Sequence, residues 1–171
     1  HAPSLGEMLT EVAGDIETSA GVTSGQLDDQ EPLWRPLPAM SGRGFPQPDG
    51  RVLSPQELAV ETQADELFFG GGLGGGKTHV LLGLSLTNHR HSVIFRREFT
   101  QLRGAEGIVE QSRQIVGLRG TLNESLFSWR GLPGGRTLEF GAARNMTDAL
   151  KWKGRAHDLK CVGAGTPVWM A

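Results

Sequence analysis

After residue 50, short apolar runs alternate with segments of helical spacing. Two apolar runs, Ala64–Phe69 and Ser92–Phe95, are predicted as strands, and the second is apolar enough to be buried in a parallel sheet. Helices are predicted at Lys77–Asn88 and at Ala105–Val116. This strand-helix-strand-helix order predicts an α/β fold in which helices flank a parallel sheet.

Local signals define the remaining elements. Ser54 is followed by Pro55 and, three positions on, by Glu57, which is the pattern of a capped helix start, and this helix is expected to end near Thr62. The glycine-rich segment 131–135 has the composition of a hairpin turn. The other predicted elements are strands at Leu126–Arg130 and Arg136–Phe140, a short helix at Thr147–Trp152 and the start of a third core strand at His157–Lys160.

The first 50 residues have a different character. They lack sustained periodicity apart from one short amphipathic helix predicted at Ser4–Ile16, and Gly21–Gly50 has the composition of a linker or disordered arm. Eight Asp and Glu against two Arg give residues 1–50 a net charge of −6, whereas eleven acids against fifteen Lys and Arg give residues 51–171 a net charge of +4. We expect an acidic, flexible arm at 1–50, regular structure from about Ser54, and a basic part that permits polyanion binding.

The composition of the whole chain restricts its class. No apolar run approaches the roughly 20 residues that a membrane-spanning helix needs, and no signal peptide is visible. One cysteine, Cys161, cannot form an internal disulfide, which suits a reducing compartment. The chain begins with His1, so we expect a fragment or a processed product.

A glycine-rich octapeptide between the first predicted strand and the following helix fits G-x-x-x-x-G-K-[ST], the P-loop or Walker A pattern. Its glycines allow main-chain N–H groups to surround an anion. Lys77 is expected to reach the β- and γ-phosphates, and the Thr78 hydroxyl to bind Mg²⁺. A flexible linker is the alternative, since the chain has 25 glycines; a linker would not normally join a strand to a helix. The predicted phosphate-binding residues are Gly71, Gly72, Leu73, Gly74, Gly75, Gly76, Lys77 and Thr78.

Five further segments accompany the loop between Ser54 and Lys160: Ser54-Pro55-Gln56-Glu57, Ala64-Asp65-Glu66-Leu67-Phe68-Phe69-Gly70-Gly71, Val93-Ile94-Phe95-Arg96-Arg97, Gln101-Leu102-Arg103 and Lys151-Trp152-Lys153-Gly154-Arg155-Ala156-His157-Asp158-Leu159. Together with the loop, these segments resemble the large subunit of tailed-phage terminases, the ATPase that drives DNA into proheads.

The resemblance implies a P-loop NTPase fold, ATP and Mg²⁺ as cofactors, double-stranded DNA as a partner, and a homo-oligomeric ring. It also implies the portal and the small terminase subunit as partners, the cytoplasm of the infected bacterial host as the location, and no membrane contact.

Single residues gain roles from the same resemblance. Gln56 is similar to the family's adenine-recognising glutamine, because an amide both donates to and accepts from the adenine edge; a surface polar residue is the alternative. Arg96 and Arg97 follow the second strand at its C-terminal edge, where ligands gather in such sheets. The functional interpretation is that one of them binds phosphate, contacts DNA or links the ATP state to movement. The alternative is a solvated pair of arginines. Arg155 has the place of an arginine that acts as a finger on a neighbour's nucleotide, or is a plain surface cation. We expect Arg97 or Arg155 to sense or stabilise the γ-phosphate.

The end of the chain departs from the family. Terminases follow this strand with an Asp-Glu pair that orients Mg²⁺ and activates water, and residues 161–171 hold neither acid. They resemble instead the opening block of an intein, in which the Cys161 thiol attacks the carbonyl of Lys160; an ordinary cysteine in a divergent strand is the alternative. We expect an incomplete ATPase part at 51–160, truncated before its metal-strand acids at an intein junction, with weak or absent ATP turnover and no DNA cleavage.

Two other functions stay open at this point. The loop is shared with many ATPases and GTPases, so a helicase or recombinase core is one alternative. A non-catalytic nucleotide-binding fragment or a protein-splicing precursor is the other.

Overall fold

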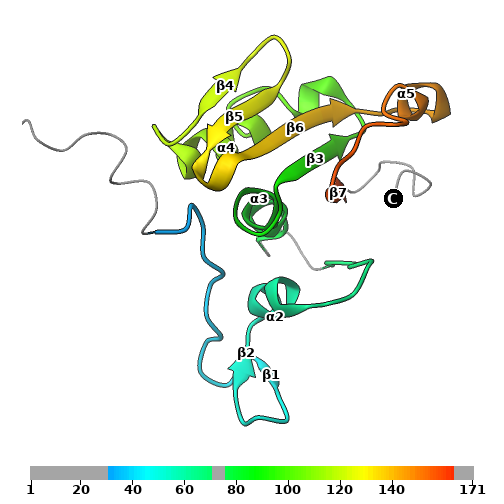
Figure 1. The fold of residues 1–171 in the computed structure, drawn as a ribbon. Helices are drawn as coiled ribbons and strands as arrows, with labels where there is room; N and C mark the ends of the chain where they lie inside the picture. Colours follow the sequence, from blue (N-terminus) through cyan, green and yellow to red (C-terminus); the bar gives the residue numbers. More distant parts are fainter. Residues whose placement is uncertain (1–30, 71–75, 164–171) are drawn as a thin grey trace, which may run out of the picture. The chain divides into compact units, whose positions relative to one another are not determined.

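The computed structural model describes residues 31–70 and 76–163, and Figure 1 shows the arrangement of their elements. The helix predicted at Ser4–Ile16 lies outside these ranges. The helices are α2 (Pro55–Glu61), α3 (Lys77–Thr87), α4 (Ile108–Val116) and α5 (Met146–Leu150), with short 3-10 turns η1 (Phe99–Gln101) and η2 (Pro133–Gly135). The strands are β1 (Phe45–Pro46), β2 (Val52–Leu53), β3 (His91–Arg96), β4 (Thr121–Asn123), β5 (Ser128–Leu132), β6 (Arg136–Ala142) and β7 (Leu159–Val162).

Five strands form the main sheet, in the order β4-β5-β6-β3-β7. The central strand β3 is parallel to both neighbours, so that Ile94 lies opposite Phe140 of β6 and Cys161 of β7. The predicted hairpin is confirmed, because β5 pairs antiparallel with β6, and β4 adds a further antiparallel strand. The α/β prediction with parallel pairs and flanking helices is therefore confirmed, but the sheet is mixed rather than parallel throughout.

The predicted strand at Ala64–Phe69 is wrong, since residues 62–70 contain no strand. A strand is held by hydrogen bonds to a neighbour, and none of the described residues pairs with this segment. Leu67 and Phe68 remain 44% and 83% exposed, so the apolar run is not buried either. Phe69 alone packs inward, against the cluster formed by Ala59, Val80 and Leu84 of α2 and α3.

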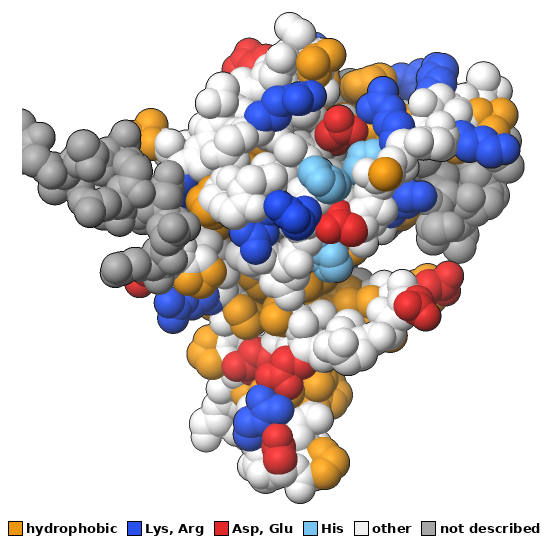
Figure 2. Space-filling model, in the orientation of Figure 1, with side chains coloured by type: hydrophobic (Ala, Val, Ile, Leu, Met, Phe, Trp, Pro, Cys, Tyr) orange, Lys and Arg blue, Asp and Glu red, His pale blue; other side chains and the backbone are white. Residues whose placement is uncertain are grey.

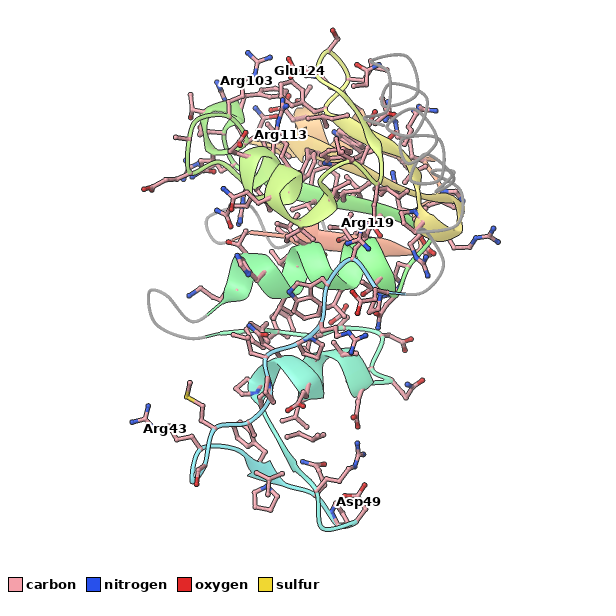
Figure 3. All side chains as sticks on the ribbon, turned by 90° about the vertical axis from the view of Figure 1, so that its left-hand side faces the viewer. Arg43, Asp49, Arg103, Arg113, Arg119 and Glu124 are labelled. Atoms are coloured by element: carbon pink, nitrogen blue, oxygen red, sulfur yellow. The ribbon has the colours of Figure 1, made fainter. Side chains whose placement is uncertain are left out.

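The two faces of the sheet are covered differently. Ile94 and its equivalents on β5, β6 and β7 pack against Leu82 and Leu86 of α3 and against α4, which makes the main core. Val93 and Phe95 point to the other face, because side chains alternate along a strand, and they pack there with Trp152 after α5. Figure 3 shows α3 between the sheet and α2. The position of a residue along β3 therefore decides whether its side chain lies on the α3 face of the sheet or on the opposite face.

Helix α2 begins as predicted. Ser54 caps it: the Glu57 N–H donates to Ser54 Oγ over 3.1 Å, and the Ser54 N–H donates to Glu57 Oε2 over 2.7 Å. The packed structure nevertheless starts earlier than the expected Ser54, because Leu33 is buried in the main core. Trp34 lies so close to α3 that a Cβ on Gly83 would be 2.1 Å from its ring. Part of the expected arm thus belongs to the folded unit.

Asp158 fixes the start of β7 against the start of β3. Its Oδ1 accepts from the His91 N–H over 2.6 Å and its Oδ2 from the Arg90 N–H over 2.7 Å. Burial by itself would raise the pKa of Asp158, but these main-chain donors outweigh it and lower the pKa below its ordinary value. The carboxylate therefore stays ionised and sets the register of the parallel pair.

None of the described helices combines the length and the apolar character that crossing a membrane requires.

On the protein surface, Arg113 of α4 forms an ion pair with Glu124 of the β4–β5 turn (Figure 3). Pairs of this kind on the surface contribute little to stability.

Candidate functional site

The glycine loop ends at the start of α3. Gly71, Gly72, Leu73, Gly74 and Gly75 lie outside the described residues. Gly76 is the N-cap of α3 and has φ 71° and ψ 13°, the left-handed conformation that glycine adopts without strain. Lys77 and Thr78 are the first two residues of this helix, and both are half-buried. The described end of the motif therefore has the turn-to-helix geometry that anion binding at a P-loop requires.

The structure brings Gln56 to this junction. Its side chain is 7% exposed, and its Oε1 accepts from the Leu37 N–H over 2.8 Å. A Cβ on Gly76 would lie 2.4 Å from Gln56 Nε2, so the amide rests directly against the end of the loop. Gln56 is thus a buried link between α2 and the loop rather than a surface residue, and adenine recognition by it stays a prediction.

Arg96 connects the sheet to the same junction. It is the last residue of β3 and points to the α3 face, like Ile94 two positions before it. Its Nη2 donates to Thr78 Oγ1 over 3.5 Å. A Cβ on Gly163, just after β7, would lie 1.8 Å from Nη1, so the guanidinium covers the main chain there. The C-terminal ends of two parallel strands and the start of α3 thus meet at one arginine, at the sheet edge where α/β folds bind ligands.

The charge of Arg96 has no acidic counterpart among the described residues. Burial lowers its pKa, and only the nearby Cys161 acts in the opposite sense. Arginine still keeps its proton at neutral pH, because its ordinary pKa lies far above neutrality. The site therefore contains a half-buried cation beside the Thr78 hydroxyl.

The two arginines selected from the sequence lie elsewhere. Arg97 is exposed and lies in a bend directly after the end of β3. Arg155 donates to Glu139 Oε2 over 3.2 Å and stacks over Trp152 at 4.5 Å from the ring centre. Glu139 alternates with core residues of β6, so this pair lies on the sheet face opposite α3. The structure brings neither arginine to Thr78, and the proposed finger on a neighbour's nucleotide stays a prediction.

Cys161 lies inside β7 and is 6% exposed. Its Sγ is 3.9 Å from Ser85 Oγ of α3, and the side chain belongs to the main core. Burial raises the pKa of the thiol to about 11, and the thiolate is the nucleophilic form. This conformation favours the alternative of an ordinary strand cysteine. Attack on the Lys160 carbonyl stays a prediction that requires a different conformation of β7.

Slow modification of Cys161 is therefore expected. At pH 8 a thiol-specific reagent should label the folded chain at least about 100-fold more slowly than the chain in denaturant, since each pKa unit changes the thiolate fraction about tenfold. The folded pKa lies above the unfolded one, so stability should fall as the pH rises from about 9 towards about 11. Absorbance stopped-flow with the single cysteine measures the rate, and fast labelling at pH 7 would contradict this assignment.

An apolar groove of about 540 Å³ lies beside α2, away from Arg96 and Thr78. It is formed by α2, the β1–β2 hairpin and the segment before the loop, and hydrophobic side chains are exposed over this part of the molecule (Figure 2). Its one acidic lining residue, Glu61, is paired with Arg51. The groove offers no group that would hold a phosphate.

Within residues 31–70 and 76–163, no three His, Cys, Asp or Glu side chains gather to hold a metal ion. The Thr78 hydroxyl is the candidate metal ligand there, and residues 159–171 add no Asp or Glu. Mg²⁺ commonly combines few protein ligands with substrate phosphates. A metal at this junction is thus expected together with a nucleotide rather than alone.

Comparisons with protein-family models, with curated proteins and with solved structures find no match for this chain.

Proposed function

We propose that this chain is the ATP-binding part of a terminase-type motor that packages double-stranded DNA. The observation that carries the proposal is the end of the glycine loop. Gly76 turns in the left-handed conformation into α3, and Lys77 and Thr78 open that helix beside the C-terminal ends of β3 and β7. A linker does not need a tight turn into a helix, whereas a phosphate-binding loop uses the start of a helix to hold the anion.

The described residues fit a Mg-nucleotide. The Gln56 amide lies against Gly76, which leaves no space for a Cβ there and holds the amide at the end of the loop. Arg96 supplies a half-buried positive charge without an acidic partner in the described part of the chain. Lys77 would hold the β- and γ-phosphates, Thr78 would ligate Mg²⁺, and Gly71–Gly75 would supply main-chain N–H groups.

The chemistry that ATP supplies is phosphoryl transfer to water, in which Mg²⁺ neutralises charge on the β- and γ-oxygens. The residues of this chain bind and orient the nucleotide. Because residues 159–171 contain no carboxylate to orient the metal or activate water, we propose binding with weak or absent turnover for these 171 residues. In the complete motor, the partners are double-stranded DNA, the portal, the small terminase subunit and further copies in a ring, in the cytoplasm of the infected bacterial host.

Titration with nucleotides tests the proposal. The 171-residue chain should bind Mg-ATP with one site per chain, bind it more tightly than Mg-GTP because Gln56 reads adenine, and lose most affinity when EDTA removes Mg²⁺. Isothermal calorimetry on protein whose folded state is verified by circular dichroism measures all three. If no nucleotide binds, the proposed function is wrong. If GTP binds as tightly as ATP, the role of Gln56 is wrong.

A further inference from the structure

The guanidinium of Arg96 occupies a position that neither its strand nor its core requires. Residues before it on the same face of β3, Ser92 and Ile94, are completely buried and pack as core. Arg96 instead lies at the C-terminal end of the strand, where its guanidinium covers Gly163 and reaches Thr78 Oγ1 at 3.5 Å. A bond of that length is weak, so it does not by itself explain why a charged group is held there.

The electrostatics of this position favour an anion. A partly desolvated charge without a partner is costly, and a ligand of opposite sign relieves that cost. Among the described residues, the titratable group that acts on its charge is the Cys161 thiol, which burial keeps neutral. The planar fork of arginine also suits phosphate oxygens better than a single ammonium does.

Thr78 identifies which part of a ligand would lie there. In the proposed function its hydroxyl would hold Mg²⁺, which would accompany the terminal phosphates of the nucleotide. Arg96 now donates to that same hydroxyl oxygen. Two cations repel each other at such a distance, so Arg96 and Mg²⁺ cannot both be bound to Thr78 Oγ1. When Mg²⁺ binds, the guanidinium has to turn to another acceptor.

We propose that Arg96 is the sensor of the terminal phosphate, donating to Thr78 without nucleotide and to a γ-phosphate oxygen when Mg-ATP is bound. This inference rests on the proposed function and deepens it, because it assigns the discrimination between ATP and ADP to one residue. It also places the sensor at the ends of both β3 and β7, so the nucleotide state is felt by the two parallel strands that carry Arg96 and Gly163.

The test compares Arg96→Gln and Arg96→Lys with the unchanged chain, using calorimetric Kd values for Mg-ATP and Mg-ADP. Arg96→Gln should weaken Mg-ATP binding at least about tenfold, the usual effect of losing a hydrogen bond to a charged group, and should change Mg-ADP binding by less than about twofold. Arg96→Lys should restore part of the ATP preference, because it keeps the charge. Arg130→Gln, which removes an exposed arginine of β5, is the control and should leave both Kd values unchanged.

The outcomes separate the two proposals. An unchanged ATP-to-ADP ratio in Arg96→Gln overturns the sensor role while nucleotide binding stands. The same holds if Arg97→Gln changes the ratio and Arg96→Gln does not. If the unchanged chain binds neither nucleotide, the proposed function and the sensor fall together. Misfolding of a variant lowers the number of binding sites for both nucleotides but leaves the ratio of the two Kd values unchanged. If Arg96→Gln does not fold, Arg96→Lys supplies the same comparison.

Discussion

Replacing Lys77 with alanine is expected to reduce the affinity for Mg-ATP by at least about 100-fold, because two charge-assisted hydrogen bonds to phosphate are lost together. Lys77 is the first residue of α3, directly after the left-handed Gly76, so its main chain is fixed where the loop ends. In the proposed function, the ammonium is the one part of the motif that would reach the β- and γ-phosphates with a full charge. No main-chain N–H group can replace it.

Calorimetry and competition with a fluorescent ATP analogue measure this loss, and circular dichroism shows whether α3 is retained. His79→Ala is the matched control, because His79 is two positions further along the same helix and exposed; its affinity should stay within about twofold of the unchanged chain. Retention of tight Mg-ATP binding by Lys77→Ala would mean that the glycine loop is not the phosphate site. A loss in both variants would indicate damage to α3 instead.

Local signals in the sequence were sufficient for several elements. The cap of α2 depends on Ser54 and Glu57 alone, and both hydrogen bonds of the capping box are present. The β5–β6 hairpin was likewise predictable, because Pro133 and the glycines around it favour a turn whatever the rest of the fold does. These features involve neighbours in sequence, which a pattern can identify.

The strand predicted at Ala64–Phe69 failed for the opposite reason. An apolar run shows that a segment can be buried in a sheet, but pairing requires a second strand whose position the run does not encode. Within the described ranges that partner is missing, and Leu67 and Phe68 are exposed. The packing of Leu33 and Trp34 was missed similarly, since two apolar residues in a Pro-rich segment form no periodic pattern.

The candidate site shows how far alternation along a strand can be used. Period two places Ile94 and Arg96 on one face of β3, whereas Arg97 follows the strand in a bend, and the sequence pattern alone did not separate the two arginines. Which face carries α3 depends on how the chain crosses over the sheet, and that was not visible. The choice between Arg96 and Arg97 therefore needed the structure, as did the burial of Cys161, whose sequence neighbours are compatible with either a core or an exposed strand.

Truncating Leu82 to alanine is expected to cost about 2–5 kcal/mol of the free energy of unfolding, the range for deleting a fully buried leucine that leaves a cavity. Leu82 lies in the middle of α3 with no exposed surface and contributes to the core formed with Ile94 and α4. Urea unfolding followed by tryptophan fluorescence measures the change, because Trp129 lies in the same core. Leu118→Ala is the matched control, since Leu118 is fully exposed and should change stability by less than about 0.5 kcal/mol.

The same variant links the fold to the site. Helix α3 carries Lys77 and Thr78 at one end and Leu82 in its centre. If Mg-ATP binds only when this helix is packed, the ligand should stabilise the folded chain, because it binds the folded state alone. Mg-ATP at 100 times its Kd is then expected to raise the free energy of unfolding by about 2.7 kcal/mol, both in Leu82→Ala and in the unchanged chain. The urea midpoint of each should rise accordingly. Equal midpoints with and without Mg-ATP would show that the nucleotide does not need the packed helix. Equal stability of Leu82→Ala and Leu118→Ala would show that α3 does not pack on the sheet through Leu82.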